Sequence, residues 1–198
     1  MLTLLRFDLY ATAFFRIVVP RGDFFNLLFS FFSLRGNSIF IWILLILTVI
    51  FIEEKKNPGF GLKDRKFLLV FISSFILTAL LTTFVVKNVV RRPRPFFRTD
   101  YSRFQLAKPV LTSACPVDFS FPSGHASTAF AAAVVLTSFN KKRKWLYYLV
   151  AVLISYSRIY LGCHYFLDTI AGALLGYLIS KIILRLSALD TFPFRRKS

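Results

Sequence analysis

The stretch that decides the fold class runs from Phe67 to Val86 and has the sequence FLLVFISSFILTALLTTFVV. It carries no charge and is as long as the roughly 20 apolar residues that an α-helix needs to cross a bilayer. Across the whole chain, 56% of the 198 residues are hydrophobic, 25 are Phe and the mean hydropathy is +0.62. Soluble domains average about 45–50% apolar residues. The composition therefore excludes an ordinary soluble domain, a disordered chain and a disulfide-rich miniprotein.

Four further apolar runs are candidate membrane spans: Ser38–Ile52, Ala126–Phe139 (which can begin at Pro122), Trp145–Leu161 and Tyr165–Leu184. The last three contain small or polar residues that lipid disfavours, so we expect them to line a protein-filled interior. Gly172 and Gly176 have the small-xxx-small spacing that lets two helix backbones approach closely. The predicted fold is an all-α, polytopic membrane helix bundle with about five spanning helices.

The N-terminal region fits helices that lie in the membrane interface. Apolar residues recur there at helical spacing, but Arg6, Asp8 and Arg16 interrupt any continuous apolar run. Pro20 breaks this pattern, and Asp23 can cap a second short helix. We predict a single membrane-embedded domain over residues 1–198, with an interfacial region at 1–36 and a spanning core at 38–186. A sixth span within the first 34 residues is the alternative.

The basic residues between the runs predict an orientation. Lys and Arg gather at 53–66, 140–144 and 195–197, segments that alternate onto one side of the membrane, and the positive-inside rule makes that side cytoplasmic. This distribution accounts for most of the net charge of +17, so we expect no nucleic-acid partner. The opposite side nevertheless carries a basic connection with Arg91, Arg92, Arg94, Arg98, Arg103 and Lys108. Guanidinium groups match phosphate oxygens, so a phosphate ligand is expected there, although interfacial charge is an alternative for Arg91 and Arg92.

Both histidines of the chain lie on that same side. His125 stands at the entry to the third span, and His164 lies between the fourth and fifth spans, four residues before Asp168. Residues four apart on a helix share a face, so the Asp168 carboxylate can accept a hydrogen bond from one ring nitrogen of His164 and raise the basicity of the other. Carboxylates within a span are rare and usually functional.

Three short motifs occur in order between Lys87 and Asp168. Lys87 is followed after six residues by Arg94-Pro95, then come Pro122-Ser123-Gly124-His125, and finally Ser157-Arg158 with His164 and Asp168. Together they resemble the tripartite signature of the type 2 phosphatidic acid phosphatase superfamily, without substitution. The resemblance implies a membrane lipid phosphatase that needs no metal and no cofactor.

The resemblance and the chemistry of the residues give the same roles. His164 would be the nucleophile, forming a phosphohistidine intermediate with the support of Asp168. His125 would protonate the leaving oxygen and then activate water. The phosphoryl oxygens would be bound by Lys87, Arg94, Arg158, Ser123 and the backbone at Gly124, where a helix N-terminus forms a natural anion site.

The expected substrate is a lipid phosphate or diphosphate, with its tail among membrane lipids. Small bacterial members of the family suggest undecaprenyl diphosphate and a plasma (inner) membrane location with the site facing outward. Phosphatidylglycerophosphate, phosphatidic acid and lipid A 1-phosphate are alternatives. A transporter or channel is the non-enzyme alternative, but its polar residues should spread along the spans instead of gathering at one end. A haloperoxidase would share the site, but those relatives are soluble.

Cys115 and Cys163 both fall on the predicted outer side, where the environment can be oxidising. A disulfide between them would tie the 91–121 connection across the site. Two lone cysteines more often stay reduced, however, so the sequence leaves both states open. It also leaves the oligomeric state open.

Overall fold

The computed structural model describes residues 2–33, 35–56, 62–95 and 115–187, and all regular structure within these ranges is helical. The α-helices are α1 (Leu2–Ile17), α2 (Asp23–Ser33), α3 (Arg35–Lys56), α4 (Leu62–Leu80), α5 (Lys87–Val90), α6 (Gly124–Phe139), α7 (Lys144–Tyr160) and α8 (Phe166–Leu186). A π-helical segment, Leu81–Val86, joins α4 to α5, and a 3-10 turn, Lys141–Arg143, precedes α7. The all-α fold class predicted from the sequence is confirmed.

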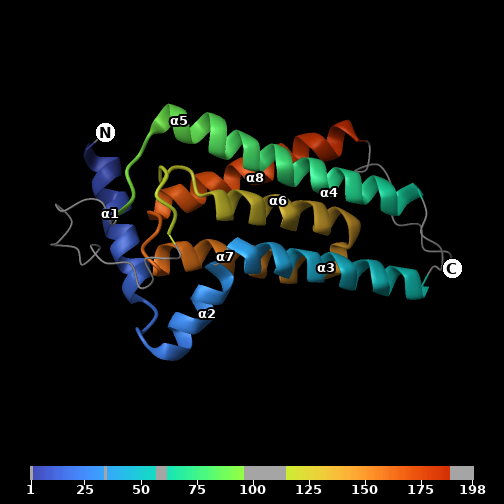
Figure 1. The fold of residues 1–198 in the computed structure, drawn as a ribbon, viewed down its shortest axis with the longest axis horizontal. Coiled ribbons are helices and arrows are strands. Elements are labelled where there is room, and N and C mark those ends of the chain that lie inside the picture. Colours follow the sequence, from blue (N-terminus) through green and yellow to red (C-terminus); the bar gives the residue numbers. More distant parts are fainter. Residues whose placement is uncertain (1, 34, 57–61, 96–114, 188–198) are drawn as a thin grey trace.

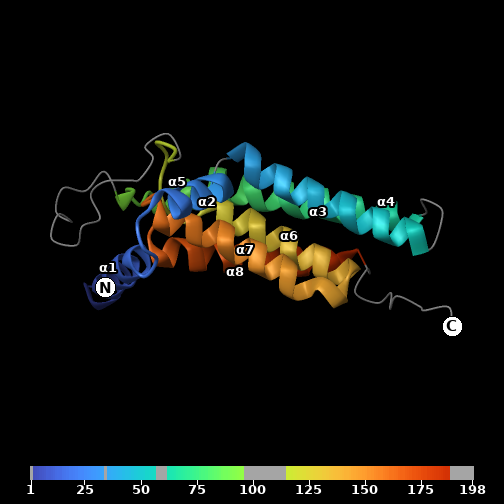
Figure 2. The same ribbon diagram turned by 90° about the horizontal axis from the view of Figure 1, so that it is seen from below.

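Five long helices, α3, α4, α6, α7 and α8, run along the length of the molecule (Figures 1 and 2). Helix α6 is the central one and packs against α8, α7 and α4. It is rich in alanine, and Ala126, Ala131 and Ala133 are completely buried. Small side chains let three neighbouring helices approach it closely. The expectation that this run lines a protein-filled interior is confirmed.

Helices α8 and α6 make a close contact at the two glycines of the small-xxx-small pattern. A Cβ atom at Gly172 would collide with the backbone carbonyl of Ser123, and one at Gly176 would collide with that of Ser127. Only glycine permits this approach without a shift of backbone. The close packing predicted from the spacing is therefore confirmed, and it sets the first turn of α6 against α8.

Among the described residues, two helical segments are long and apolar enough to cross a membrane, namely Asp64–Val90 and Phe166–Leu186. Asp23–Ser33 and Asn37–Ile52, which meet at an angle of 73°, qualify together as a third, while Gly124–Phe139 is a shorter apolar helix. Large apolar side chains also point outward along the bundle, among them Leu47, Ile72 and Leu178. The number of spans stays a prediction.

Helix α1 crosses one end of the bundle instead of lying alongside it (Figures 1 and 2). Polar contacts attach the N-terminal helices to α7 and α8. The Tyr156 hydroxyl donates to the Phe15 carbonyl at 2.8 Å, and the Tyr160 hydroxyl donates to Asn26 Oδ1 at 2.8 Å. These contacts fix the N-terminal helices to the core, whereas a position in a membrane interface stays a prediction.

The two ends of the bundle differ in character. Helix α6 begins at the end that holds His125 and runs to the opposite end, where α7 begins at Lys144. The two histidines and the basic 140–144 segment therefore lie at opposite ends, as the alternation of charge predicts (Figure 1). Which end faces the cytoplasm stays a prediction.

Candidate active site

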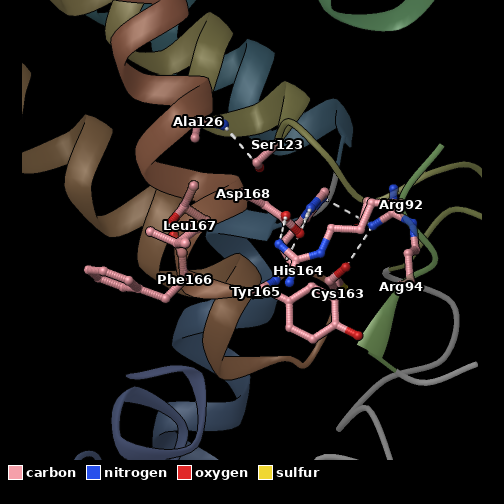
Figure 3. Close-up of polar contacts among 12 residues, drawn as sticks. Arg92, Arg94, Ser123, Ala126, Cys163, His164, Tyr165, Phe166, Leu167 and Asp168 are labelled. Carbon is pink, nitrogen blue, oxygen red and sulfur yellow. Dashed lines mark hydrogen bonds and ion pairs between the residues drawn. The ribbon is translucent and has the colours of Figure 1, made fainter. Parts of the chain in front are cut away.

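Three segments far apart in the sequence meet at the bundle end that α1 crosses. They are the residues after α5, the segment that precedes α6, and the connection between α7 and α8 (Figure 3). The Ser120 amide donates to the Arg92 carbonyl at 2.8 Å, and the Ser123 amide donates to the Asp168 carbonyl at 2.9 Å. Backbone hydrogen bonds thus bring the three sequence motifs together.

Asp168 occupies the first turn of α8 and directs one carboxylate oxygen toward the residues that precede the helix. Its Oδ2 accepts the Tyr165 amide at 2.9 Å and lies 3.4 Å from His164 Nδ1. The two groups are close, as predicted, but the hydrogen bond itself stays a prediction, because Nδ1 has no hydrogen-bond partner among the described residues. The predicted cause was wrong, however, because α8 begins at Phe166 and His164 lies outside it. The turn before the helix folds the imidazole back over the first helical turn.

Arg94 is completely buried and holds the other side of the imidazole. Its Nη1 lies 3.0 Å from His164 Nε2 and donates to the Cys163 carbonyl at 2.8 Å. Its Nε donates to the Asp118 carbonyl at 2.8 Å, and Nη2 bonds the carboxylate of Asp118. Because a guanidinium can only donate, His164 Nε2 accepts, and the proton of the neutral ring lies on Nδ1.

The surroundings keep His164 uncharged. Burial lowers the pKa of His164 well below 6.5, and the positive charges of Arg94, Arg158 and Lys87 lower it further. A neutral imidazole with an available lone pair is a nucleophile, whereas an imidazolium is not. The predicted nucleophile is therefore in the protonation state that the reaction requires.

Asp118 pairs with both cations of the first motif. Its carboxylate contacts the Lys87 ammonium and the Arg94 guanidinium. Partial burial alone would raise the pKa of Asp118, but the hydrogen bond from Lys87 and the charge of Arg94 outweigh that effect and lower it. The sequence analysis overlooked this residue. No motif marks it, since it lies outside all three.

Arg92, for which interfacial charge was one alternative, belongs to the site. Its Nη1 donates to Asp168 Oδ1 at 2.7 Å, and its guanidinium lies 3.8 Å from the centre of the Tyr165 ring. It stands two residues before Arg94, so Arg92 contacts the carboxylate and Arg94 the imidazole of the His164–Asp168 pair. In the sequence, the signal for this role was the position of Arg92 between Lys87 and Arg94 of the first motif.

Arg158, predicted to bind phosphate, is completely buried near His164. Its Nη1 donates to the Ser33 carbonyl at 3.0 Å and contacts the Ser33 hydroxyl. Ser33 is the last residue of α2, where helix carbonyls lack partners and carry partial negative charge. Part of the guanidinium thus fixes α2 to α7, and a contact with phosphate stays a proposal.

The second motif forms the start of α6. Ser123 caps this helix, its hydroxyl accepting the Ala126 amide at 3.4 Å. Gly124 is the first residue of the helix, and His125, the second, is partly exposed. These residues lie beside the Asp168 backbone, at the positive end of the α6 dipole.

The structure pairs Cys115 with Cys163 in a disulfide whose Cα atoms are 5.2 Å apart. The sequence left open whether these two cysteines are bonded or reduced, and in the structure they are bonded. The bond ties the segment that carries Asp118 to the residue before His164. Arg98, Arg103 and Lys108, three basic residues of the connection where a phosphate ligand is expected, lie outside the described residues. Within the described ranges, no three His, Cys, Asp or Glu residues cluster as a metal site would require.

Comparison with known proteins now identifies the family. Residues 67–191 match the PAP2 superfamily, and this range contains all three motifs. The chain belongs to the PAP2 superfamily. The undecaprenyl-diphosphatase of Sulfolobus acidocaldarius is 32% identical to this PAP2 chain over 173 residues, which cover 86% of the chain and 74% of that relative.

Two solved PAP2-like structures share the fold. The transmembrane PAP2-type phosphatidylglycerolphosphate phosphatase of Bacillus subtilis superposes with a TM-score of 0.63 at 24% identity, covering 98% of this chain and 90% of that one. LpxE of Aquifex aeolicus gives a TM-score of 0.56 at 28% identity and covers 93% and 94%. The predictions of an integral membrane protein and of a lipid phosphatase are confirmed.

Proposed function

We propose that this PAP2 phosphatase hydrolyses undecaprenyl diphosphate without a metal, through a phosphohistidine at His164. The observation that carries the proposal is the placement of neutral His164 between the Asp168 carboxylate and the Arg94 guanidinium. The undecaprenyl-diphosphatase relative, which this chain matches over most of its length, supports the choice of lipid.

In the first step, Nε2 of His164 attacks the terminal phosphorus while the bond from that phosphorus to the bridging oxygen breaks. The ring becomes positively charged, and Asp168 stabilises it through the Nδ1 proton. His125 gives its proton to the departing oxygen, which leaves as the lipid monophosphate. Water then attacks the phosphohistidine, His125 accepts a proton from that water, and inorganic phosphate departs with His164 restored.

The phosphoryl oxygens would be bound by Lys87, Arg94 and Arg158 and by the Ser123 and Gly124 region at the start of α6. Positive charge fixed in a site with little water stabilises the negative charge that spreads over these oxygens in the transition state. Arg94 would exchange its contact with Nε2 for a contact with phosphate. At the same time, the Asp118 carboxylate would lose its contacts with Lys87 and Arg94.

The position of the site supports a lipid substrate. The site lies at one end of a bundle with apolar outer faces, so a headgroup could reach it while the tail remains in the bilayer. We infer that this end faces the outside of a bacterial plasma membrane, because the basic 140–144 segment lies at the other end. Membrane lipids are the expected partners, and nucleic acid is not.

The test is phosphate release by the detergent-solubilised protein from undecaprenyl diphosphate, phosphatidylglycerophosphate, phosphatidic acid and lipid A 1-phosphate, each with and without EDTA. We expect the highest kcat/KM with undecaprenyl diphosphate and no effect of EDTA. A preference for another lipid would overturn the assignment of undecaprenyl diphosphate as the substrate. Loss of activity with EDTA would overturn the metal-free mechanism.

The phosphohistidine is tested separately with substrate labelled in the terminal phosphate and rapid alkaline quenching. Labelled native protein is expected, and neither label nor turnover is expected in His164→Ala. His125→Ala should slow turnover least with an activated aryl phosphate, whose leaving oxygen needs no proton. Normal turnover by His164→Ala would overturn the mechanism.

A further inference from the structure

Asp8, in the N-terminal helix α1, lies outside the residues that match the family. Its side chain is only 1% exposed. Both carboxylate oxygens are engaged, Oδ1 by the Leu167 amide at 2.8 Å and Oδ2 by Arg92 Nη2 at 2.6 Å. A buried carboxylate is stable only when it is paired and hydrogen-bonded, so these partners account for its position.

The same guanidinium of Arg92 also holds Asp168. Nη2 bonds Asp8, and Nη1 bonds Asp168 Oδ1 at 2.7 Å. One planar group therefore bridges two buried carboxylates, one from α1 and one from α8. With Oδ1 occupied by Arg92, Oδ2 of Asp168 is left for the Tyr165 amide and for His164 Nδ1.

Helix α1 also binds the start of α8 directly. The Thr12 hydroxyl accepts the Phe166 amide at 2.9 Å and donates to the Asp8 carbonyl at 2.6 Å. Phe166 and Leu167 are the first two residues of α8, whose amides have no partner within their own helix. Side chains of α1 therefore satisfy the helix start that carries Asp168.

We propose that Asp8 is a positioning residue for catalysis, acting through Arg92 to keep Asp168 directed at His164. The inference rests on the proposed function, because it assigns Asp8 to the same reaction. It makes α1 part of the catalytic apparatus, although none of the three motifs includes it. The polar partners that Asp8 has among the described residues are Thr12, Arg92 and Leu167, none of which is proposed to bind phosphate, so its effect should fall on the rate of the chemical step.

The experiment compares Asp8→Asn, Arg92→Gln and the double variant in the full-length, detergent-solubilised protein, with phosphatase kinetics and thermal unfolding measured on each. Asp23→Asn and Arg185→Gln are matched controls, since both side chains are exposed and neither belongs to the site. For Asp8→Asn and Arg92→Gln we expect kcat to fall by about 10-fold or more, as is typical when a partner that orients a reacting group is removed. KM should stay nearly constant. The double variant should be no slower than Arg92→Gln, because Asp8 acts through Arg92.

A kcat for Asp8→Asn close to the native value, or effects that multiply in the double variant, would overturn the proposal. If Asp8→Asn does not fold, Arg92→Lys keeps the charge but cannot bridge both carboxylates as the planar fork does. A native kcat for Arg92→Lys would then overturn the proposal, and a reduced kcat at unchanged KM would support it. Failure of the proposed function is distinct, since the native protein itself would then release no phosphate from any lipid.

Discussion

Arg94 Nη1 lies 3.0 Å from His164 Nε2, so the atom predicted to attack phosphorus faces a positive charge in the unliganded site. This contact directs the lone pair toward the place where the phosphoryl group would bind, and it leaves the Nδ1 proton facing Asp168. The same guanidinium contacts Asp118. One arginine thus connects the predicted nucleophile with the carboxylate that pairs with the cations proposed to bind phosphate.

The acidic limb of the pH–rate profile should lie below 6.5. Burial first, and then the charges of Arg94, Arg158 and Lys87, lower the pKa of His164, so the nucleophile stays neutral as the pH falls through 6.5. The unfolded chain would take up this proton earlier, so folding stability should also decline on the acidic side of that value. Measurement of kcat/KM against pH checks the first point. Arg94→Gln removes one of these charges and should move the limb to higher pH, and an unchanged limb in that variant would contradict the assignment.

Asp118→Asn should tighten the binding of inorganic phosphate or vanadate as a competitive inhibitor. Its partly exposed carboxylate contacts Lys87 and Arg94, the cations proposed to bind phosphate, so it would compete with phosphate for them. We expect the inhibition constant to fall about fivefold, which corresponds to an ion pair worth about 1 kcal/mol in a partly exposed position. Asp23→Asn is the control. A rise in the constant would mean that Asp118 instead holds the two cations in place.

Gly176→Ala should destabilise the fold. A methyl group there would meet the Ser127 carbonyl of α6, whereas Gly22 has open space around it. Overpacking of this kind costs about 1–3 kcal/mol, and the shift would also displace the first turns of α6. Thermal unfolding in detergent measures the effect, with Gly22→Ala as the matched control. Equal unfolding temperatures for the two variants would contradict the close packing.

Reduction of the Cys115–Cys163 disulfide should lower the unfolding temperature. The bond closes a loop with a sequence separation of 48 residues, for which the chain-entropy model gives about 4 kcal/mol as an upper estimate. Reductant should lower the unfolding temperature of the native protein and leave that of Cys115→Ala unchanged. An identical response in both proteins would show that the stability does not depend on this bond.

The sequence by itself determined the all-α fold class, because the charge-free run from Phe67 to Val86 suits a helix in lipid. It also indicated a close helix contact at Gly172 and Gly176, but only the structure showed that α6 is the partner. The three motifs were recognisable in the sequence as well and lie within the range that matches the PAP2 superfamily, while the roles of their residues stay predictions. These features depend on neighbouring or regularly spaced residues, so they can be recognised in the order of the amino acids.

Only the tertiary structure decided which charged and polar side chains pair with one another. Asp8 and Asp118 lie outside the three motifs, and each pairs with residues from a distant segment. Asp8 pairs with Arg92, and Asp118 pairs with Lys87 and Arg94. The contact of Arg158 with Ser33 likewise joins residues 125 positions apart. Burial forces each of these charged or polar groups to find a partner, but which partner it finds depends on how the helices pack, and the linear order of the residues does not record that.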